Sequence, residues 1–254
     1  METASLMMTT FNRLELTKRM LSSLFENTLS PYHLIIVDNG STDGTVDWLK
    51  NLNDNAQKRP SNCVGYTFHY NKENRGIAIG RNQGLKLSHQ FNDPWLSTLD
   101  NDIELPKNWL SNCIDILKAN PKYMTGVNME NSPYPLMTQN GQTFQFKVRG
   151  NLGTACAVFS RELHNKIGYF IDIAGFLYSH EDSDFGFRAR TLGYNMSYLP
   201  ENGTHFGEGD LDVGEYRDFK TTQSKNNLAN FQSNCYAYMS KAKPVYIPFD
   251  EEVI

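Results

Sequence analysis

Long apolar runs and an excess of basic residues are both missing from this sequence. No stretch approaches the roughly 18 consecutive apolar residues of a membrane-spanning helix, and the N-terminus lacks a basic segment followed by an apolar one. We therefore expect no integral membrane segment. The formal net charge is −4, so a global electrostatic attraction to nucleic acid or anionic lipid is not expected.

Cysteine is also scarce, and its spacing excludes two classes of site. The four cysteines lie far apart and none forms a Cys-x-x-Cys pair; they are Cys63, Cys113, Cys156 and Cys235. This pattern argues against a zinc site and a disulfide framework, and favours reduced thiols packed as small apolar residues. We expect a cytoplasmic protein, and a peripheral position at the membrane face stays open.

Short apolar segments alternate with amphipathic ones along the first two thirds of the chain of 254 residues. SLMMTT, HLIIVDNGS, CVGYTFHY and WLSTLDND predict strands, and LELTKRMLSSLFEN, GTVDWLKNL and GIAIGRNQGLKLSHQ predict the helices between them. The alternation is typical of βαβ units. We therefore expect an α/β, Rossmann-like fold with a mostly parallel central sheet flanked by helices.

The pattern loosens after a helix predicted from NWLSNCIDILKAN. Residues 129–149 predict a long loop or a small antiparallel hairpin, because they are rich in Asn, Gln, Pro and Ser. GTACAVFS predicts another strand, RELHNKIGYF and HEDSDFGFRARTLGY predict two helices, and NMSYLP predicts the final strand. Residues 221–240 carry apolar side chains at helical spacing, and we expect a helix that covers one side of the site.

One predicted helix carries a stripe of glycines. Gly76, Gly80 and Gly84 recur every four residues, although glycine costs about 1 kcal/mol relative to alanine inside a helix. Two explanations stay open: close packing of the helix on the sheet, or close approach of a ligand.

Acidic residues follow two predicted strands directly. Asp38 ends the second strand, Asp100 and Asp102 end the fourth, and Glu181 and Asp182 begin a later helix. Ligands of open α/β sheets bind beyond the carboxyl ends of the strands, so these acids are expected to converge on one crevice. An Asp-x-Asp pair can bind one divalent cation that also binds phosphate. A solvated turn or a helix cap is the alternative for the Asp-x-Asp pair taken alone.

Five motifs between residue 5 and about residue 207 give these acids a context: TTFNRLELTKRMLSSL, LIIVDNGSTDGT, NKENRGIAIGRNQGL, LDND and HEDSDFGFRARTLGY. In this order and spacing they resemble the GT-A glycosyltransferases of family 2, inverting enzymes that use nucleoside-diphosphate sugars. The resemblance implies a GT-A catalytic domain over residues 1–220, with a nucleotide-sugar-binding half (1–128) and an acceptor-binding half (129–220) that holds a small acceptor-side subdomain. Residues 221–254 would form a C-terminal helix and tail packed on it.

The resemblance implies a nucleoside site at the ends of the first two strands. Thr9, Thr10 and Asn12 would lie along the nucleoside, and Asp38 would accept a hydrogen bond from the base. A carboxylate suits the donor N–H of an imide, so a UDP- or dTDP-sugar is the favoured donor.

The resemblance also implies a diphosphate and sugar site. Asn74, Arg75 and Gly76 match the family's Asn-x-Gly segment, and Arg81 and Asn82 extend it towards the nucleotide and sugar. Arg81 is the better phosphate ligand, because a guanidinium can bind two oxygens at once. An exposed helix arginine is the alternative.

A divalent metal, Mn²⁺ or Mg²⁺, is the implied cofactor. Asp100 and Asp102 match the Asp-x-Asp element, with Asp102 as the more direct ligand and Asp100 as a ligand or a ribose or sugar contact; Asn101 between them is neutral and is counted with the donor site. His205 in GTHFGEG falls where related enzymes often supply a third ligand, and a structural histidine is the alternative.

Glu181 and Asp182 match the family's Glu-Asp pair, and Asp182 is expected to be the general base. It would take the proton of an acceptor hydroxyl as that oxygen attacks the anomeric carbon, which inverts its configuration. Glu181, Asp184 and Arg188 would orient the site. The alternative for Asp184 and Arg188 is an ion pair, four residues apart, that only stabilises the surface of the helix.

Two other functions stay open. A nucleotide-sugar-binding module would keep the site without turnover, and a nucleotidyltransferase of related fold would normally carry a glycine-rich loop after the first strand, where TTFNRLE has no glycine. The sequence leaves the acceptor undetermined among a glycan, a glycolipid, a protein and a modified nucleic acid, and it leaves the oligomeric state undetermined.

Overall fold

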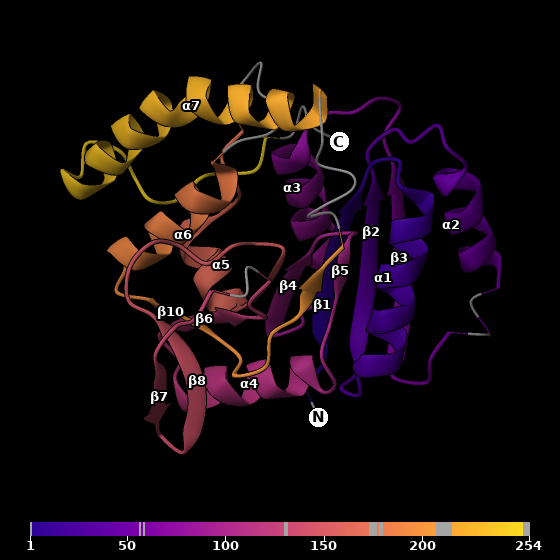
Figure 1. The fold of residues 1–254 in the computed structure, drawn as a ribbon, viewed down its shortest axis with the longest axis horizontal. Helices are drawn as coiled ribbons and strands as arrows, with labels where there is room; N and C mark the ends of the chain where they lie inside the picture. Colours follow the sequence, from indigo (N-terminus) through magenta and orange to yellow (C-terminus); the bar gives the residue numbers. More distant parts are fainter. Residues whose placement is uncertain are drawn as a thin grey trace.

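The computed structural model describes residues 2–55, 57, 59–129, 132–172, 177, 180–206 and 215–250. Within this part of the chain, strands join into one large sheet in the order β3-β2-β1-β4-β9-β6-β10-β8-β7 (Figure 1). Its members are β1 (Ala4–Thr10), β2 (Tyr32–Asp38), β3 (Cys63–Tyr70), β4 (Trp95–Leu99), β6 (Tyr123–Gly126), β7 (Leu136–Gln139), β8 (Gln142–Lys147), β9 (Cys156–Ser160) and β10 (Asn195–Tyr198).

The α/β prediction is confirmed, and the sheet divides into two parts. Strands β3, β2, β1 and β4 pair in parallel, as the βαβ pattern predicts. Beyond β4 the sheet is mixed: β9 runs antiparallel to both β4 and β6, β6 pairs in parallel with β10, and β8 and β7 add antiparallel strands. The predicted βαβ units therefore account for the first half of the sheet.

Helices cover both faces of the sheet, and each face has its own apolar cluster. One cluster contains side chains of α1 (Leu14–Asn27), α2 (Thr45–Asp54) and α4 (Trp109–Ala119). The other contains side chains of α3 (Ile77–Ser88), α5 (Arg161–Ile167) and α6 (Glu181–Thr191). Strand β2 shows the alternation: Leu34 and Ile36 enter the first cluster and Ile35 the second, as expected for a strand buried on both faces.

A second, two-stranded sheet corrects one sequence-based prediction. Strand β10 was expected to be the last, but β11 (Thr204–His205) follows it and pairs antiparallel with β5 (Ile103–Glu104). Strands of two residues are too short to show a hydrophobic period, so the sequence gives no sign of them. This pairing brings the segment that contains His205 beside the Asp-x-Asp turn.

The chain beyond α4 agrees with the predicted hairpin. Strands β7 and β8 pair antiparallel around Asn140 and Gly141, whose φ angles of 50° and 79° suit the Asn-Gly turn that favours such hairpins. Helix α7 (Glu215–Met239) begins before the predicted residue 221 and lies across α6 (Figure 1). Among the described residues no helix is long and apolar enough to cross a membrane, and the four cysteines are free thiols.

The glycine stripe of α3 serves helix-to-sheet packing. A Cβ atom at Gly80 would lie 2.5 Å from Cγ2 of Thr9, and one at Gly84 would lie 3.2 Å from Cβ of Met7. Both neighbours belong to β1, so the absence of side chains lets α3 approach the strand that ends at the candidate site. Of the two explanations, the packing one holds for Gly80 and Gly84.

Replacing Gly80 by alanine should therefore destabilise the fold. We expect Gly80→Ala to lower the free energy of unfolding by about 1–3 kcal/mol, as for other overpacked positions. The matched control is Gly65→Ala in β3, where the nearest atom to an added Cβ, Cδ2 of His33, is 3.5 Å away. Urea denaturation of both variants tests this, and equal stability of the two would contradict the packing explanation.

Candidate active site

The predicted site residues gather at one edge of the parallel sheet. Strands β2, β1 and β4 are neighbours, with Thr10 opposite Asp38 and Met8 opposite Leu99, so their carboxyl ends lie together. The Asp-x-Asp turn follows β4 directly. The expected convergence of strand ends is therefore present in the fold.

Three potential metal ligands lie together at this edge. Asp100, Asp102 and His205 each offer one ligand atom, and these atoms lie within 4.8 Å of one another. The β5–β11 pairing places them there: the Phe206 N–H donates to the Asp102 carbonyl (2.7 Å), and Nε2 of His205 is 3.5 Å from Oδ1 of Asp102. Two carboxylates and an imidazole form a donor set that suits Mn²⁺ and also accepts Mg²⁺.

Each acid of the Asp-x-Asp pair also contacts an arginine. Nη1 of Arg13 lies 2.8 Å from Oδ2 of Asp102, and Nη2 of Arg81 lies 2.9 Å from Oδ1 of Asp100. The sequence analysis missed Arg13, because it stands in the loop after β1, 89 residues from Asp102. Its neighbour Asn12 was predicted to contact the nucleoside, which is the one signal that could have pointed to this loop.

Arg81 joins the Asp-x-Asp turn to the start of α6. Its side chain is 8% exposed, so the alternative of an exposed helix arginine is wrong. Besides Asp100 it contacts Glu181, with 2.8 Å between Nη1 and Oε1. Burial, reinforced by the Asp182 carboxylate, raises the pKa of Glu181 to about 7, while Arg81 opposes the shift.

Asp182 differs from Glu181 in its surroundings. Glu181 is buried and bonded to Arg81, whereas Asp182 is partly exposed and its Oδ1 accepts hydrogen bonds from the amide and hydroxyl groups of Ser183. Of the two acids, Asp182 is therefore the more accessible to solvent.

Asp38 presents an unused acceptor at the end of β2. Its Oδ1 accepts from the backbone N–H groups of Gly40 (3.1 Å) and Ser41 (2.9 Å). Its buried Oδ2 has no hydrogen-bond partner among the described residues. An unsatisfied buried oxygen costs free energy, and with less than 1 Å² of exposed surface Oδ2 lies beneath neighbouring groups that a ligand N–H would have to displace.

Asn39, which the sequence analysis did not single out, holds the Asn-x-Gly segment in place. Its Nδ2 donates to Oδ1 of Asn74 and to the carbonyl of Gly76, both at 3.0 Å. Its Oδ1 accepts from the backbone N–H of Arg75 at 3.2 Å and from Nδ2 of Asn71 at 3.0 Å. The three predicted residues therefore line up beside the end of β2, and Asn39 fixes their backbone.

Several predicted donor residues use their side chains within the protein. Nδ2 of Asn101 donates to Oγ1 of Thr10 (2.9 Å) and of Thr17 (3.1 Å). The amide of Asn82 donates to and accepts from the backbone of Phe170, at 2.8 Å each.

Thr9 and Asn12 also have protein partners. The methyl group of Thr9 faces Gly80, and Oδ1 of Asn12 accepts from the Thr42 N–H. The contacts of these four residues position the loops around the site, and their predicted contacts with a donor remain predictions.

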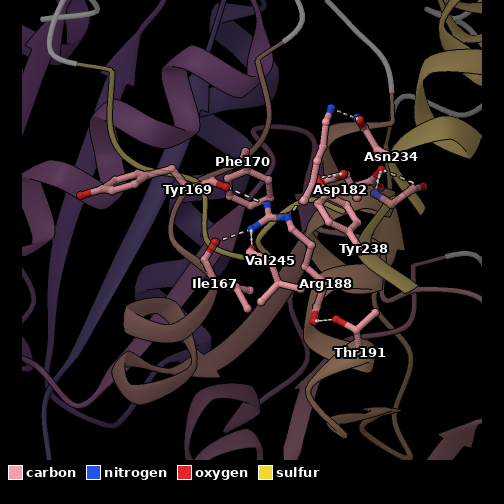
Figure 2. A network of polar contacts seen from close by, with 12 residues as sticks. Ile167, Tyr169, Phe170, Asp182, Arg188, Thr191, Asn234, Tyr238 and Val245 are labelled. Carbon is pink, nitrogen blue, oxygen red and sulfur yellow. Dashed lines mark hydrogen bonds and ion pairs between the residues drawn. The ribbon is translucent and has the colours of Figure 1, made fainter. Parts of the chain in front are cut away.

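The Asp184–Arg188 pair is buried, so its interpretation as surface helix support is wrong. Nε of Arg188 lies 2.6 Å from Oδ1 of Asp184, and neither side chain is more than 1% exposed. Figure 2 shows the Arg188 guanidinium directed at backbone carbonyls, with donations to Ile167, Tyr169 and Val245. The Tyr238 hydroxyl donates to Oδ2 of Asp184 at 3.0 Å, so the pair ties α6 to α7 and to the tail.

Comparison with known proteins assigns the family. Residues 5–168, well over half of the chain, match the family described as Glycosyl transferase family 2. The chain belongs to glycosyl transferase family 2. No curated protein sequence matches it significantly.

Solved structures agree on the fold of this family 2 member. One is the mannosyltransferase PcManGT from Pyrobaculum calidifontis in complex with GDP-Man and Mn²⁺, with a TM-score of 0.58, 19% identity, and coverage of 78% of this chain and 55% of that one. Another is S. aureus TarS 1-349 in complex with UDP, with a TM-score of 0.58, 18% identity, and coverage of 79% and 59%. The expected GT-A fold is confirmed, and the chain spans less than two thirds of either structure.

The raised pKa of Glu181 predicts a pH-dependent stability. The carboxyl ordinarily titrates near 4.5 and in the fold near 7, so its stabilising contribution is full below about pH 4.5 and is lost as the pH rises through about 7. Between about pH 5 and pH 8, the wild type should lose up to about 3 kcal/mol of unfolding free energy relative to Glu181→Gln. Denaturant titrations at both pH values measure this difference, and parallel pH profiles would show that Glu181 titrates normally.

The buried Asp184–Arg188 pair predicts a large loss on removal of one charge. Asp184→Asn leaves Arg188 buried without its counter-charge, and we expect a loss of about 3–5 kcal/mol of unfolding free energy. Tyr238→Phe removes only the neutral donor to the same carboxylate and should cost about 1 kcal/mol. Thermal and urea unfolding compare the variants, and a loss for Asp184→Asn no greater than that for Tyr238→Phe would contradict this assignment.

Proposed function

We propose that this chain is an inverting glycosyltransferase that moves a sugar from a nucleoside-diphosphate sugar to an acceptor hydroxyl. The arrangement that carries the proposal is the pairing of Arg81 with both Asp100 and Glu181. This contact joins the three potential metal ligands to the Glu-Asp pair. A diphosphate bound to the metal and a carboxylate that acts as a base would then lie on either side of the same donor sugar. Membership of glycosyl transferase family 2 supports the same reaction.

A UDP- or dTDP-sugar is the favoured donor. Uracil and thymine each present one imide N–H, and the buried Oδ2 of Asp38 is an acceptor without a partner among the described residues. The similar structures were solved with UDP in one case and with GDP-Man in another, so the base is the part of the donor to be tested first. The diphosphate would lie towards Arg81 and the Asp-x-Asp turn.

The proposed chemistry is a single displacement. Asp182 would take the proton of the acceptor hydroxyl while that oxygen bonds to the anomeric carbon, and the bond from that carbon to the diphosphate oxygen would break. Mn²⁺ or Mg²⁺ held by Asp100, Asp102 and His205 would supply positive charge that stabilises the leaving diphosphate. Glu181, held by Arg81, would keep the start of α6 in place.

Asp102→Ala tests the metal and donor site. Calorimetric titration of the wild type with UDP, dTDP, GDP, CDP and ADP, with and without Mn²⁺ or Mg²⁺, should show metal-dependent binding of one of them. Asp102→Ala should weaken that binding by at least about tenfold, because the diphosphate loses its metal. Unchanged metal-dependent binding in Asp102→Ala would remove its assignment as a ligand.

Asp182→Asn tests the general base. This variant should bind donor and metal like the wild type and lose at least about 100-fold in transfer rate, because general-base catalysis typically contributes this much or more. Asn has nearly the same shape as Asp, so the folded site is retained. Donor binding without transfer in the wild type, with glycan, glycolipid, protein and nucleic acid acceptors, would favour a binding module. Full transfer by Asp182→Asn would remove the base assignment.

A further inference from the structure

The loop after β1 directs Arg13 at the metal site through an unusual backbone. Asn12 and Arg13 are consecutive residues with left-handed φ angles of 54° and 61°, a conformation that residues other than glycine, asparagine and aspartate rarely adopt. Neighbouring side chains hold it: Oγ of Ser41 accepts from the Asn12 N–H (2.7 Å), and Oδ2 of Asp43 accepts from the Leu14 N–H (2.9 Å). These hydrogen bonds maintain the conformation that sets the direction of the Arg13 side chain.

The side chain of Arg13 places a positive charge beside Asp102, where a metal ion would also bind. Its Nη1 lies 2.8 Å from Oδ2 of Asp102, one of the three potential metal ligands, whose side chain is only 7% exposed. Asp100 is paired in the same way with Arg81 at 2.9 Å. Each acid of the Asp-x-Asp pair therefore contacts a guanidinium group, although Arg81 shares its charge with Glu181.

The ion pair between Arg13 and Asp102 opposes the binding of a metal ion alone. A divalent ion that binds Asp102 without a nucleotide would bring two positive charges next to the Arg13 guanidinium, which already lies against one oxygen of that carboxylate. A nucleoside-diphosphate sugar carries two negative charges on its diphosphate, which balance those of the ion. The pairing therefore favours joint entry of metal and donor over entry of metal alone.

We infer that Arg13 is a second diphosphate-binding residue, which pairs with Asp102 when no donor is bound and moves to the diphosphate when donor and metal bind together. The inference rests on the proposed function, since it takes the diphosphate as the ligand. Arg13 is better suited to this movement than Arg81: its side chain is 23% exposed, whereas that of Arg81 is 8% exposed and bridges two acids. An arginine also matches phosphate oxygens in geometry.

The consequence is reciprocal coupling between the two ligands. Arg13 repels the metal while it stays on Asp102, and stops doing so once the diphosphate draws it away. The diphosphate therefore strengthens metal binding, and by linkage the metal strengthens diphosphate binding by the same factor.

Arg13→Asn is the test variant, because it removes the charge and because Asn adopts the left-handed conformation more readily than most residues. Free Mn²⁺ is measured by electron paramagnetic resonance in titrations with Mn²⁺ alone, and UDP and GDP are titrated by calorimetry with and without Mn²⁺. Arg13→Lys keeps the charge. Arg59→Asn is the matched control, because Arg59 is exposed and precedes β3, at the opposite edge of the sheet from the site.

Arg13→Asn should bind Mn²⁺ alone at least about tenfold more tightly than the wild type, since a like charge has been removed from beside the ion. The factor by which Mn²⁺ and the nucleotide strengthen each other should fall about tenfold, Arg13→Lys should lie between the two, and Arg59→Asn should match the wild type. Unfolding temperatures confirm that the variants are folded.

Two results would overturn the inference: an affinity of Arg13→Asn for Mn²⁺ alone that is equal to or below that of the wild type, or an unchanged coupling factor. The first would assign Arg13 to the orientation of Asp102. If neither UDP nor GDP bound the wild type in the presence of Mn²⁺, the proposed donor site would fail. The titrations with Mn²⁺ alone would separate that failure from the behaviour of Arg13.

Discussion

The contacts of one buried cation, Arg81, determine how the rest of the site is arranged. Its guanidinium bonds to Asp100 after β4 and to Glu181 at the start of α6, two segments that come from opposite halves of the chain. A buried charge is tolerated only when it is paired, and carboxylates placed close together repel one another unless a cation lies between them. Arg81 meets both requirements, and it thereby fixes the distance between the Asp-x-Asp turn and the Glu-Asp pair.

The sequence predicted those parts of the fold whose signal lies within a single segment. The strands that end in Asp38 and Asp100 are apolar runs followed by acids, and the helix that begins at Glu181 has acids in its first turn; each of these patterns is local. The Asp-x-Asp pair was expected from its place after a strand, but His205 was added to the potential metal ligands only through the family resemblance, because two strands of two residues each bring it to Asp102. Arg13 was missed for a similar reason, since its partner lies 89 residues away and no local pattern marks an ion pair.

The sequence motifs predicted which residues lie near the site, but they did not predict which groups the side chains contact. Asn82 and Asn101 occupy predicted donor positions, yet the amide of each is bonded to other protein groups, Phe170 in one case and Thr10 with Thr17 in the other. Buried amides need several partners, and backbone and hydroxyl groups near the site supply them. Asn82 and Asn101 therefore hold together the loops around the candidate site.

The β5–β11 pairing has a consequence for how the three potential metal ligands come together during folding. The three potential ligands span residues 100 to 205, and the chain from β5 to β10 separates His205 from the two aspartates. Contacts between residues so distant in sequence form late and slowly compared with local ones. High-affinity metal binding would therefore appear only after the two halves of the chain have packed together. Binding of the ion would then be a measure of complete folding. It would also stabilise the closed state, because a ligand that binds only the folded protein shifts the folding equilibrium towards it.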